Sequence, residues 1–273
     1  MAALLTGCGT GTKPDVPLSV MSFNIRYANV HDGEHAWIHR KEAVIRMLEE
    51  LSPAIIGIQE GLYEQVLYLD SALFGYSYTG VGRDDGSTGG EYAAIFFDAQ
   101  RFEEIASGNF WLSETPDRPS VGWDAVCVRI ATWVKLRDRE TGRSLACINT
   151  HFDHVGTTAR MRSAQMLADS IASIGADMPV VVTGDFNSTP ADPALRSLAG
   201  NPALAEARET TGSAGKEPDY TYIGFEGKPE PGSVIDHIFV EDFDVTGYTI
   251  VTDSYGVPQL SDHYPVLAEI KYR

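Results

Sequence analysis

The chain has 273 residues, of which 43% are hydrophobic and 22% are charged, a composition typical of a folded soluble protein with a substantial core. Its 21 basic and 38 acidic side chains leave a net charge of −17. This charge repels polyanions, so it disfavours nucleic acid as a partner, although a local basic cleft could persist inside an acidic surface. Solubility alone would also explain the acidic balance.

The N-terminal segment, residues 1–17, differs from the rest of the chain. Leu5-Thr6-Gly7-Cys8 resembles a bacterial lipobox, in which the cysteine is lipidated, and residues 9–14 read as a flexible tether. Only seven residues precede Cys8, which is short for a signal peptide, so we expect the start to be truncated. The interpretation predicts an extracytoplasmic bacterial protein, either a lipoprotein attached to a membrane through Cys8 or a periplasmic or secreted one.

Residues 18–273 are predicted to form a single domain, because strand-like and helix-like patterns alternate without a break in composition. Helices are expected at 37–51, 62–73 and 157–174. Loops are expected where Gly, Asp and Pro gather, at 80–90, 115–123 and 208–228. The predicted strands are 18–27, 54–59, 76–81, 92–97, 102–111, 125–136, 144–151, 180–182, 234–240, 245–251 and 266–272. Such a strand-rich set predicts an α/β fold with two packed sheets and helices outside.

Polar residues recur at the ends of these predicted strands. Taken singly, an Asp or Asn after a strand is more often a turn former or a helix cap. Taken together, they favour one site, because loops at strand ends converge on the same edge of a sheet. The candidate residues are Asn24, Glu60, His151, Asp185, Asn187, Asp236, Asp262 and His263.

The chemistry of this set favours a hard cation. Carboxylate and amide oxygens suit Mg²⁺ or Mn²⁺, whereas the sequence has no His-Glu-x-x-His zinc motif, no Walker-type loop and no Gly-x-Ser-x-Gly elbow. Hydrolysis of a phosphate ester needs a cation on the phosphoryl oxygens, a base for water and donors for the developing charge. The candidate residues supply all three.

Six short motifs resemble those of one protein family and occur along the chain in the same order as in that family. They are 21–27 (MSFNIRY), 58–60 (IQE), 149–154 (NTHFDH), 184–187 (GDFN), 235–239 (IDHIF) and 261–266 (SDHYPV). This pattern resembles the endonuclease/exonuclease/phosphatase superfamily, which includes DNase I. The resemblance implies a four-layer α/β/β/α sandwich, in which two mixed β-sheets are flanked by helices.

The resemblance also implies a metal site. Asn24, Glu60 and Asp262 match the residues around the divalent ion, Mg²⁺ or Mn²⁺. Arg26 stands where some nucleases have a further acidic ligand, so that ligand is missing here. A second ion near Asp185 stays open.

The same resemblance implies catalytic roles for five residues. Asp185 matches the residue that orients or deprotonates the attacking water, and Asn187 would contact the scissile phosphate. His263 would stabilise the phosphoryl charge, while Asp236 would fix its tautomer and raise its basicity. His151 matches a position near the leaving group or the phosphate.

Two weaker matches concern the substrate and the support of the site. Arg129 is a candidate for phosphate binding together with Asn187 and His263, but a strand arginine also pairs readily with carboxylates. Glu91 matches a glutamate that can support His151.

These observations predict a divalent-metal-dependent phosphoesterase, either a phosphodiesterase or a phosphatase, that uses an Asp-activated water. The expected substrate is a phosphate ester of a small molecule or lipid, and no obligate protein partner is indicated. A nuclease acting on DNA or RNA is the first alternative. An alternative of another class is a non-catalytic surface binding lipoprotein on the same scaffold, because a fold alone does not establish catalysis.

Overall fold

The computed structural model describes residues 16–213, 216, 218–225 and 229–273. The lipobox-like motif therefore lies outside the described residues, and membrane attachment through Cys8 stays a prediction. In the described part of the chain, no helix combines the length and apolar character needed to cross a membrane.

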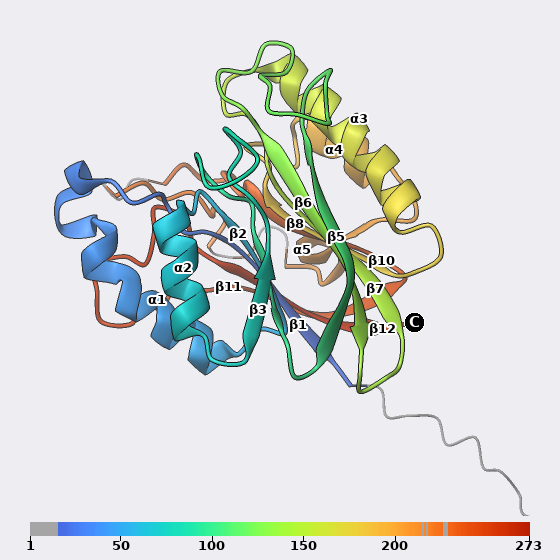
Figure 1. Ribbon diagram of the computed structural model, residues 1–273, viewed down its shortest axis with the longest axis horizontal. Coiled ribbons are helices and arrows are strands. Elements are labelled where there is room, and N and C mark those ends of the chain that lie inside the picture. Colours follow the sequence, from blue (N-terminus) through green and yellow to red (C-terminus); the bar gives the residue numbers. More distant parts are fainter. Residues whose placement is uncertain (1–15, 214–215, 217, 226–228) are drawn as a thin grey trace, which may run out of the picture.

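Two mixed six-stranded sheets form the centre of the molecule (Figure 1). In each sheet one strand pair is parallel, β1–β2 in the first and β7–β8 in the second, and the other pairs are antiparallel. The first sheet has the order β11 (Phe243–Ile250), β12 (Val266–Tyr272), β1 (Leu18–Asn24), β2 (Ile55–Gln59), β4 (Ile95–Asp98) and β3 (Tyr76–Thr79). The second has the order β5 (Phe102–Trp111), β6 (Ile130–Asp138), β7 (Ser144–His151), β8 (Val180–Asp185), β10 (Asp236–Glu241) and β9 (Ala205–Glu206).

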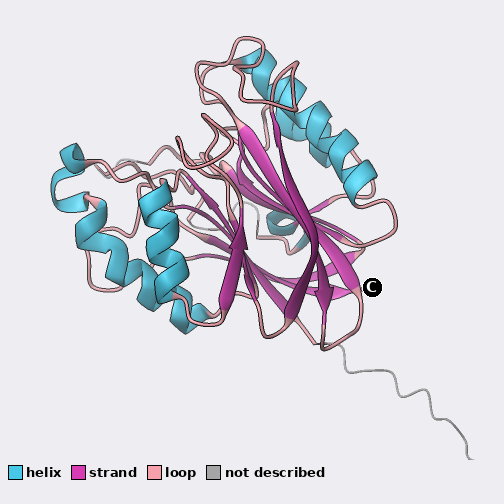
Figure 2. Ribbon diagram, viewed as in Figure 1, coloured by secondary structure: helices cyan, strands magenta, loops and turns pink. Residues whose placement is uncertain are grey.

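Helices cover the outer face of each sheet (Figure 2). The apolar face of α1 (Trp37–Leu51) packs with α2 (Tyr63–Ala72) on the first sheet. On the second sheet, α3 (Thr157–Ile174) and α4 (Pro193–Ala199) bury their apolar side chains. A third core cluster fills the space between the two sheets. The predicted four-layer α/β/β/α sandwich is therefore confirmed.

Several predicted boundaries were wrong, and each has a local reason. The strand predicted at 125–136 begins only at Ile130, because the backbone N–H of Val126 donates instead to Asp153 Oδ1 (3.2 Å) at the edge of the site. Three short helices were also missed: η1 (Val30–His35), α4 and α5 (Ala207–Thr210). They contain too few turns for their apolar residues to show a clear helical period.

A buried polar network joins the two sheets beneath their shared edge. Gln59 donates to Asn149 Oδ1 (2.7 Å), Thr183 donates to the same oxygen (3.0 Å), and Asn149 donates to the carbonyl of Ile58 (2.7 Å). The sheets approach so closely here that a Cβ on Gly57 would lie 2.0 Å from Thr183 Oγ1. This contact fixes the ends of β1 and β2 against the ends of β7 and β8, and the polar residues of interest follow from those ends.

Candidate active site

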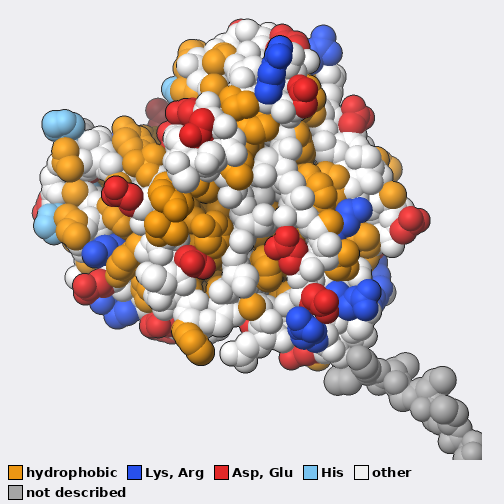
Figure 3. Space-filling model, viewed as in Figure 1, with side chains coloured by type: hydrophobic (Ala, Val, Ile, Leu, Met, Phe, Trp, Pro, Cys, Tyr) orange, Lys and Arg blue, Asp and Glu red, His pale blue; other side chains and the backbone are white. Residues whose placement is uncertain are grey.

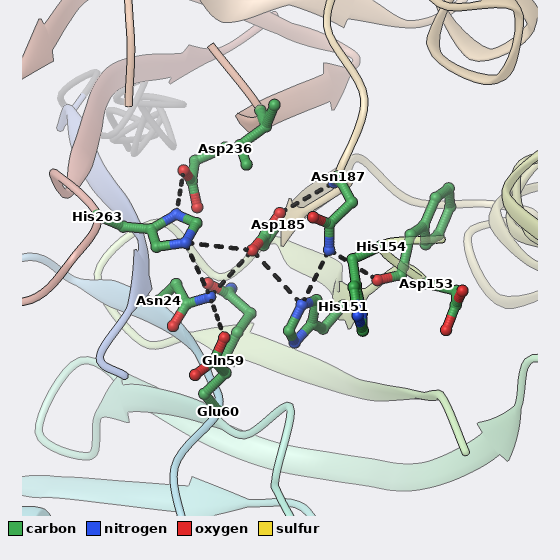
Figure 4. A network of polar contacts seen from close by, with 12 residues as sticks. Asn24, Gln59, Glu60, His151, Asp153, His154, Asp185, Asn187, Asp236 and His263 are labelled. Carbon is green, nitrogen blue, oxygen red and sulfur yellow. Dashed lines mark hydrogen bonds and ion pairs between the residues drawn. The ribbon is translucent and has the colours of Figure 1, made fainter. Parts of the chain in front are cut away.

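A cleft of about 450 Å³ opens at this shared edge. The structure brings all eight sequence-predicted residues to it. Six of them line the cleft, namely Glu60, His151, Asp185, Asn187, Asp262 and His263. Asn24 and Asp236 are fully buried directly behind that lining, where they contact it (Figure 4).

Strand register accounts for much of this convergence. Asp185 ends β8, where His151 is its partner on β7 and Asp236 is its partner on β10. Asn24 ends β1 opposite Gln59 of β2. The next residue, Glu60, has a left-handed backbone (φ 63°), which turns the chain sharply out of the sheet. Four strands therefore bring four polar side chains to this edge, and a turn adds Glu60 as the fifth.

Asp185 lies at the centre of the polar contacts drawn in Figure 4. Its Oδ2 accepts a hydrogen bond from Asn24 Nδ2 (2.9 Å), and its Oδ1 accepts one from the backbone N–H of Asn187 (2.9 Å). The Nε2 atoms of His151 and His263 lie 3.4 and 3.7 Å from Oδ2. Burial and the nearby Asp236 raise the pKa of Asp185 to about 7, against the opposing charge of His263.

The two histidines have opposite electrostatic environments. Burial alone would lower the pKa of His263, but Asp236 and Asp185 outweigh it and hold that pKa well above its ordinary value. Burial and the positive charge of Arg129 hold the pKa of His151 well below its ordinary value. These opposite shifts favour the imidazolium form of His263 and the neutral form of His151.

The contact between Asp236 and His263 fixes the orientation of the charged ring. Asp236 Oδ2 lies 2.9 Å from His263 Nδ1, so Nδ1 carries a proton toward the carboxylate. Nε2 is then directed toward Asp185 and the cleft. This is the geometry that the sequence predicted for the pair.

Asn187 connects His151 to the main chain. Its Nδ2 donates to the carbonyl of Phe152 (2.9 Å) and lies 3.1 Å from His151 Nε2.

The support for His151 that was expected from Glu91 is only a long contact, with Glu91 Oε2 4.0 Å from His151 Nδ1. Glu91 is instead held by two hydrogen bonds from Arg83 (2.6 and 2.8 Å), so Arg83 competes with the histidine for this carboxylate.

The carboxylates of Glu60 and Asp262 provide oxygen donors of the kind that Mg²⁺ and Mn²⁺ prefer. Asn24 Nδ2 donates to Glu60 Oε1 (3.0 Å), while its Oδ1 accepts from the backbone N–H of Arg26 (3.0 Å). The NH₂ group of Asn24 therefore faces the carboxylates. In this arrangement Glu60 and Asp262 fit a hard cation directly, and Asn24 orients Glu60.

Two other groups in the described part of the chain have donor atoms close enough to share an ion. Asp185, Asp236 and His263 form the first, in which most ligand atoms take part in the contacts above but Asp236 Oδ1 has no hydrogen-bond partner. Cys127, Asp153 and His154 form the second, at the mouth of the cleft. There Arg129 donates through Nη2 to His154 Nδ1 (3.0 Å), which places a fixed positive charge next to the donors and opposes a cation.

Arg129 contacts a carboxylate, as a strand arginine was expected to, and its binding of phosphate stays a prediction. It is buried, its Nε lies 3.6 Å from Asp153 Oδ1, and its guanidinium lines the cleft. Its Nε and Nη1 atoms are buried without a hydrogen-bond partner. Buried donors normally have partners, so these two groups are candidates for contact with an anionic ligand in the cleft.

Arg40 is a supporting residue that the sequence reasoning missed. It is 1% exposed, and its guanidinium donates to the carbonyls of Arg26 (2.8 Å), Leu260 (2.9 Å) and Ile25. It thereby ties the end of β1 to the segment before Asp262. A signal was present, because Arg40 occupies the apolar face of the predicted helix at 37–51.

Comparison with known proteins gives a consistent assignment. The model of the Endonuclease/Exonuclease/phosphatase family matches residues 21–263. A solved endonuclease/exonuclease/phosphatase from Bacteroides vulgatus is 39% identical, with a TM-score of 0.88, and the alignment covers 94% of this chain and 100% of that one. A mannosyl-6-phosphatase from Bacteroides thetaiotaomicron is 35% identical, with a TM-score of 0.87, and the alignment covers 93% and 99% of the two chains.

Curated relatives are more distant. A carbon catabolite repressor protein 4 homolog from Arabidopsis thaliana is 28% identical over 178 residues, which are 63% of this chain and 38% of that protein. The chain thus spans well under half the length of this relative.

Proposed function

Because this chain belongs to the endonuclease/exonuclease/phosphatase family, we propose that it is a divalent-metal-dependent phosphatase acting on the phosphate monoester of a small molecule. The observation that carries this proposal is the convergence of Asp185, His263 and Asn187 in one cleft beside Glu60 and Asp262. Family members are hydrolases of phosphate esters. A sugar phosphate is the favoured substrate, since the similar Bacteroides protein is a mannosyl-6-phosphatase and the cleft has the volume of a small-molecule site.

In the proposed reaction, Asp185 takes a proton from a water that attacks phosphorus. A carboxyl group whose pKa is about 7 is suited to this step near neutral pH. The P–O bond to the leaving group breaks as the new P–O bond forms, and the leaving alkoxide takes up a proton to become an alcohol. Hydrogen bonds from Asn24 and the backbone of Asn187 keep Asp185 oriented.

The phosphoryl charge is stabilised by donors that are already in place. His263 directs Nε2 to the cleft, and its raised pKa favours the protonated form, while Asn187 and His151 line the cleft beside it. A divalent cation held by Glu60 and Asp262 would add positive charge at the phosphoryl oxygens and the leaving oxygen. Arg129 contributes the donors that lack protein partners.

Site-directed variants test the assignment of the site. Asp185→Asn and His263→Ala should each reduce kcat by about 10³-fold, since both remove groups that act in the transition state. The assay is phosphate release from mannose 6-phosphate and p-nitrophenyl phosphate with Mg²⁺ or Mn²⁺. Asp70→Asn, at an exposed position on α2, is the matched control and should keep full activity. Full activity in both site variants would show that the chemistry lies elsewhere.

A substrate panel separates the remaining alternatives. Bis-p-nitrophenyl phosphate, inositol phosphates, phospholipids and nucleic acids would be compared with the monoesters under the same conditions. Faster turnover of nucleic acid would favour the nuclease alternative. Metal binding without turnover of any ester would favour a non-catalytic binding protein.

We also propose an extracytoplasmic location, which rests only on the lipobox-like sequence around Cys8. Cys8→Ser should move the protein from the membrane fraction to the soluble fraction when it is expressed with a functional signal peptide. An unchanged membrane fraction would contradict lipidation at this cysteine.

A further inference from the structure

Arg26 lies next to the two carboxylates that fit a cation. Its Nη1 is 3.9 Å from Glu60 Oε2 and 3.8 Å from Asp262 Oδ2. Both distances exceed that of a hydrogen bond, so these contacts are ion pairs through space. One guanidinium group thus supplies positive charge to the same two oxygens that a divalent cation would need.

The other two nitrogens of the Arg26 guanidinium are held by a different carboxylate, that of Asp32. Nε and Nη2 donate to the two oxygens of Asp32, each at 3.2 Å. The guanidinium carbon also lies 4.3 Å from the centre of the Tyr27 ring. Because Asp32 holds two of the three nitrogens, Nη1 is left to face Glu60 and Asp262.

The backbone of Arg26 is fixed as well. It has a left-handed conformation (φ 56°), which is uncommon for a residue other than glycine. Asn24 Oδ1 accepts its N–H, and its carbonyl accepts from Arg40 (2.8 Å) and Gln65 (3.0 Å). Three hydrogen bonds to its backbone therefore hold Arg26 at the cation site, which a loosely held surface arginine would not have.

We propose that the Arg26 guanidinium offsets the negative charge of Glu60 and Asp262 in the metal-free protein. When a divalent cation binds, the cation replaces the guanidinium next to these two carboxylates. The inference rests on the metal dependence in the proposed function. Both cations act on the same carboxylate oxygens, so their interactions oppose each other, and each weakens the other by the same factor. Arg26 thus sets an upper limit on metal affinity. In the metal-free protein it also reduces the repulsion between the carboxylates of Glu60 and Asp262.

Arg26 then has a second task in the metal-loaded protein. Its guanidinium remains anchored to Asp32, and Nη1 is released toward the cleft that Arg26 lines. The planar guanidinium matches the spacing of phosphoryl oxygens. Arg26 therefore becomes a phosphate-binding residue only after the carboxylates are neutralised, which couples substrate binding to metal binding.

The test uses Arg26→Gln, which removes the charge and keeps much of the side-chain length. Titration calorimetry of the metal-free protein with MgCl₂ and MnCl₂ should give a Kd that is about tenfold lower than in the wild type. Thermal unfolding gives a second readout: the variant should have a lower Tm in EDTA and a larger rise in Tm with Mg²⁺. The KM for mannose 6-phosphate at saturating Mg²⁺ should rise in the same variant.

Two further variants separate this effect from others. Arg83→Gln removes an equal charge from the same cleft, but from a residue paired with Glu91, so its Kd for Mg²⁺ should change less than about twofold. Arg26→Lys keeps the charge but loses the fork that spans Asp32 and both carboxylates. It should give an intermediate Kd, and it serves as the test if the glutamine variant does not fold.

The outcomes are distinguishable. An unchanged Kd in both Arg26 variants, or an equal gain in Arg83→Gln, would overturn the proposal. If the wild type bound neither Mg²⁺ nor Mn²⁺, the metal dependence in the proposed function would fail first, and the role of Arg26 would fall with it. Tighter metal binding combined with a higher KM in Arg26→Gln supports both parts of the proposal.

Discussion

Asp236 and His263 form a buried, closely paired contact at the cleft. Asp236 is fully buried, and its only hydrogen-bonded side-chain oxygen lies 2.9 Å from His263 Nδ1. His263 is 4% exposed, so little solvent is available to stabilise its charge. The imidazolium therefore depends on Asp236, and a change in the carboxylate should alter the protonation of the ring.

Asp236→Asn should make this dependence visible in the stability of the metal-free protein. The pKa of His263 is raised in the fold, so its stabilising contribution is fully present below the unfolded pKa of about 6.5 and is lost as the pH rises through the folded value. The difference in unfolding free energy between wild type and variant should therefore be largest below about pH 6.5 and shrink toward alkaline pH. Urea denaturation in EDTA, repeated at pH values from below about 6.5 to alkaline pH, measures this difference in unfolding free energy.

The matched control places the same substitution in a His263→Gln background. There, most of the pH dependence of the difference should disappear, because the titrating ring is absent. A difference that stayed constant with pH in the wild-type background would show that Asp236 acts through packing alone.

Local motifs at strand ends were sufficient to predict that the eight candidate residues would gather in one place, whereas their roles stay a prediction. The contacts of Arg26, Arg40 and Arg83 were not predictable in this way. Arg40 reaches the carbonyl of Leu260, 220 positions away, and no pattern within one segment encodes such a pairing. Arg83 pairs with Glu91 only eight positions away, but the loop pattern gave no indication of this pair, which reduces the support expected for His151.

At the scale of elements, the cleft depends on how closely the two sheets meet. Gly57 on β2 faces Thr183 on β8, where a Cβ would lie 2.0 Å from Thr183 Oγ1 and 2.7 Å from Asn149 Oδ1. The strands that carry Asn24 and Asp185 adjoin this contact. A wider spacing between the sheets would therefore separate the two sides of the site.

Gly57→Ala should lower the free energy of unfolding by at least about 2 kcal/mol, because overpacking of a well-filled interior is costly. It should also reduce kcat, since the distance between Asn24 and Asp185 would increase. Gly247→Ala on β11 is the control: its Cβ would meet Glu269 at an ordinary 3.4 Å. Adding Thr183→Ala to the Gly57 variant should recover part of the lost stability. Equal stability of both glycine variants would mean that the sheets can separate without cost.

Element types were predicted better than element boundaries. The long helices at 37–51 and 157–174 match α1 and α3 in full, because both carry several turns of apolar periodicity. The strand expected from 125 was wrong at its start, since an apolar run does not reveal that Asp153 will capture the N–H of Val126. Helices of four to seven residues, such as α5 and α4, are too short to produce a period.

At the scale of the whole molecule, the net charge is −17, and acidic groups also line the cleft. Acidic and basic side chains are intermixed on the face drawn in Figure 3. The cleft is lined by three arginines and four carboxylates: Arg26, Arg83, Arg129, Glu60, Glu91, Asp185 and Asp262. The basic groups of the cleft are therefore balanced by neighbouring carboxylates, and the cleft has the volume of a small-molecule site.

This distribution predicts a weak response of activity to salt. Between 50 and 300 mM NaCl, kcat/KM for mannose 6-phosphate should fall by no more than a few-fold, because a small substrate displaces few counterions. Binding of a fluorescent DNA oligonucleotide, measured by anisotropy at 150 mM NaCl, should be weaker than about 100 µM, the weak end of non-specific affinities. A slope near −4 for log K against log salt, with tight binding, would instead indicate several phosphate contacts and favour the nuclease alternative. The acidic surface argues against that result, because each contact beyond the cleft would have to form against the repulsion of the molecule as a whole.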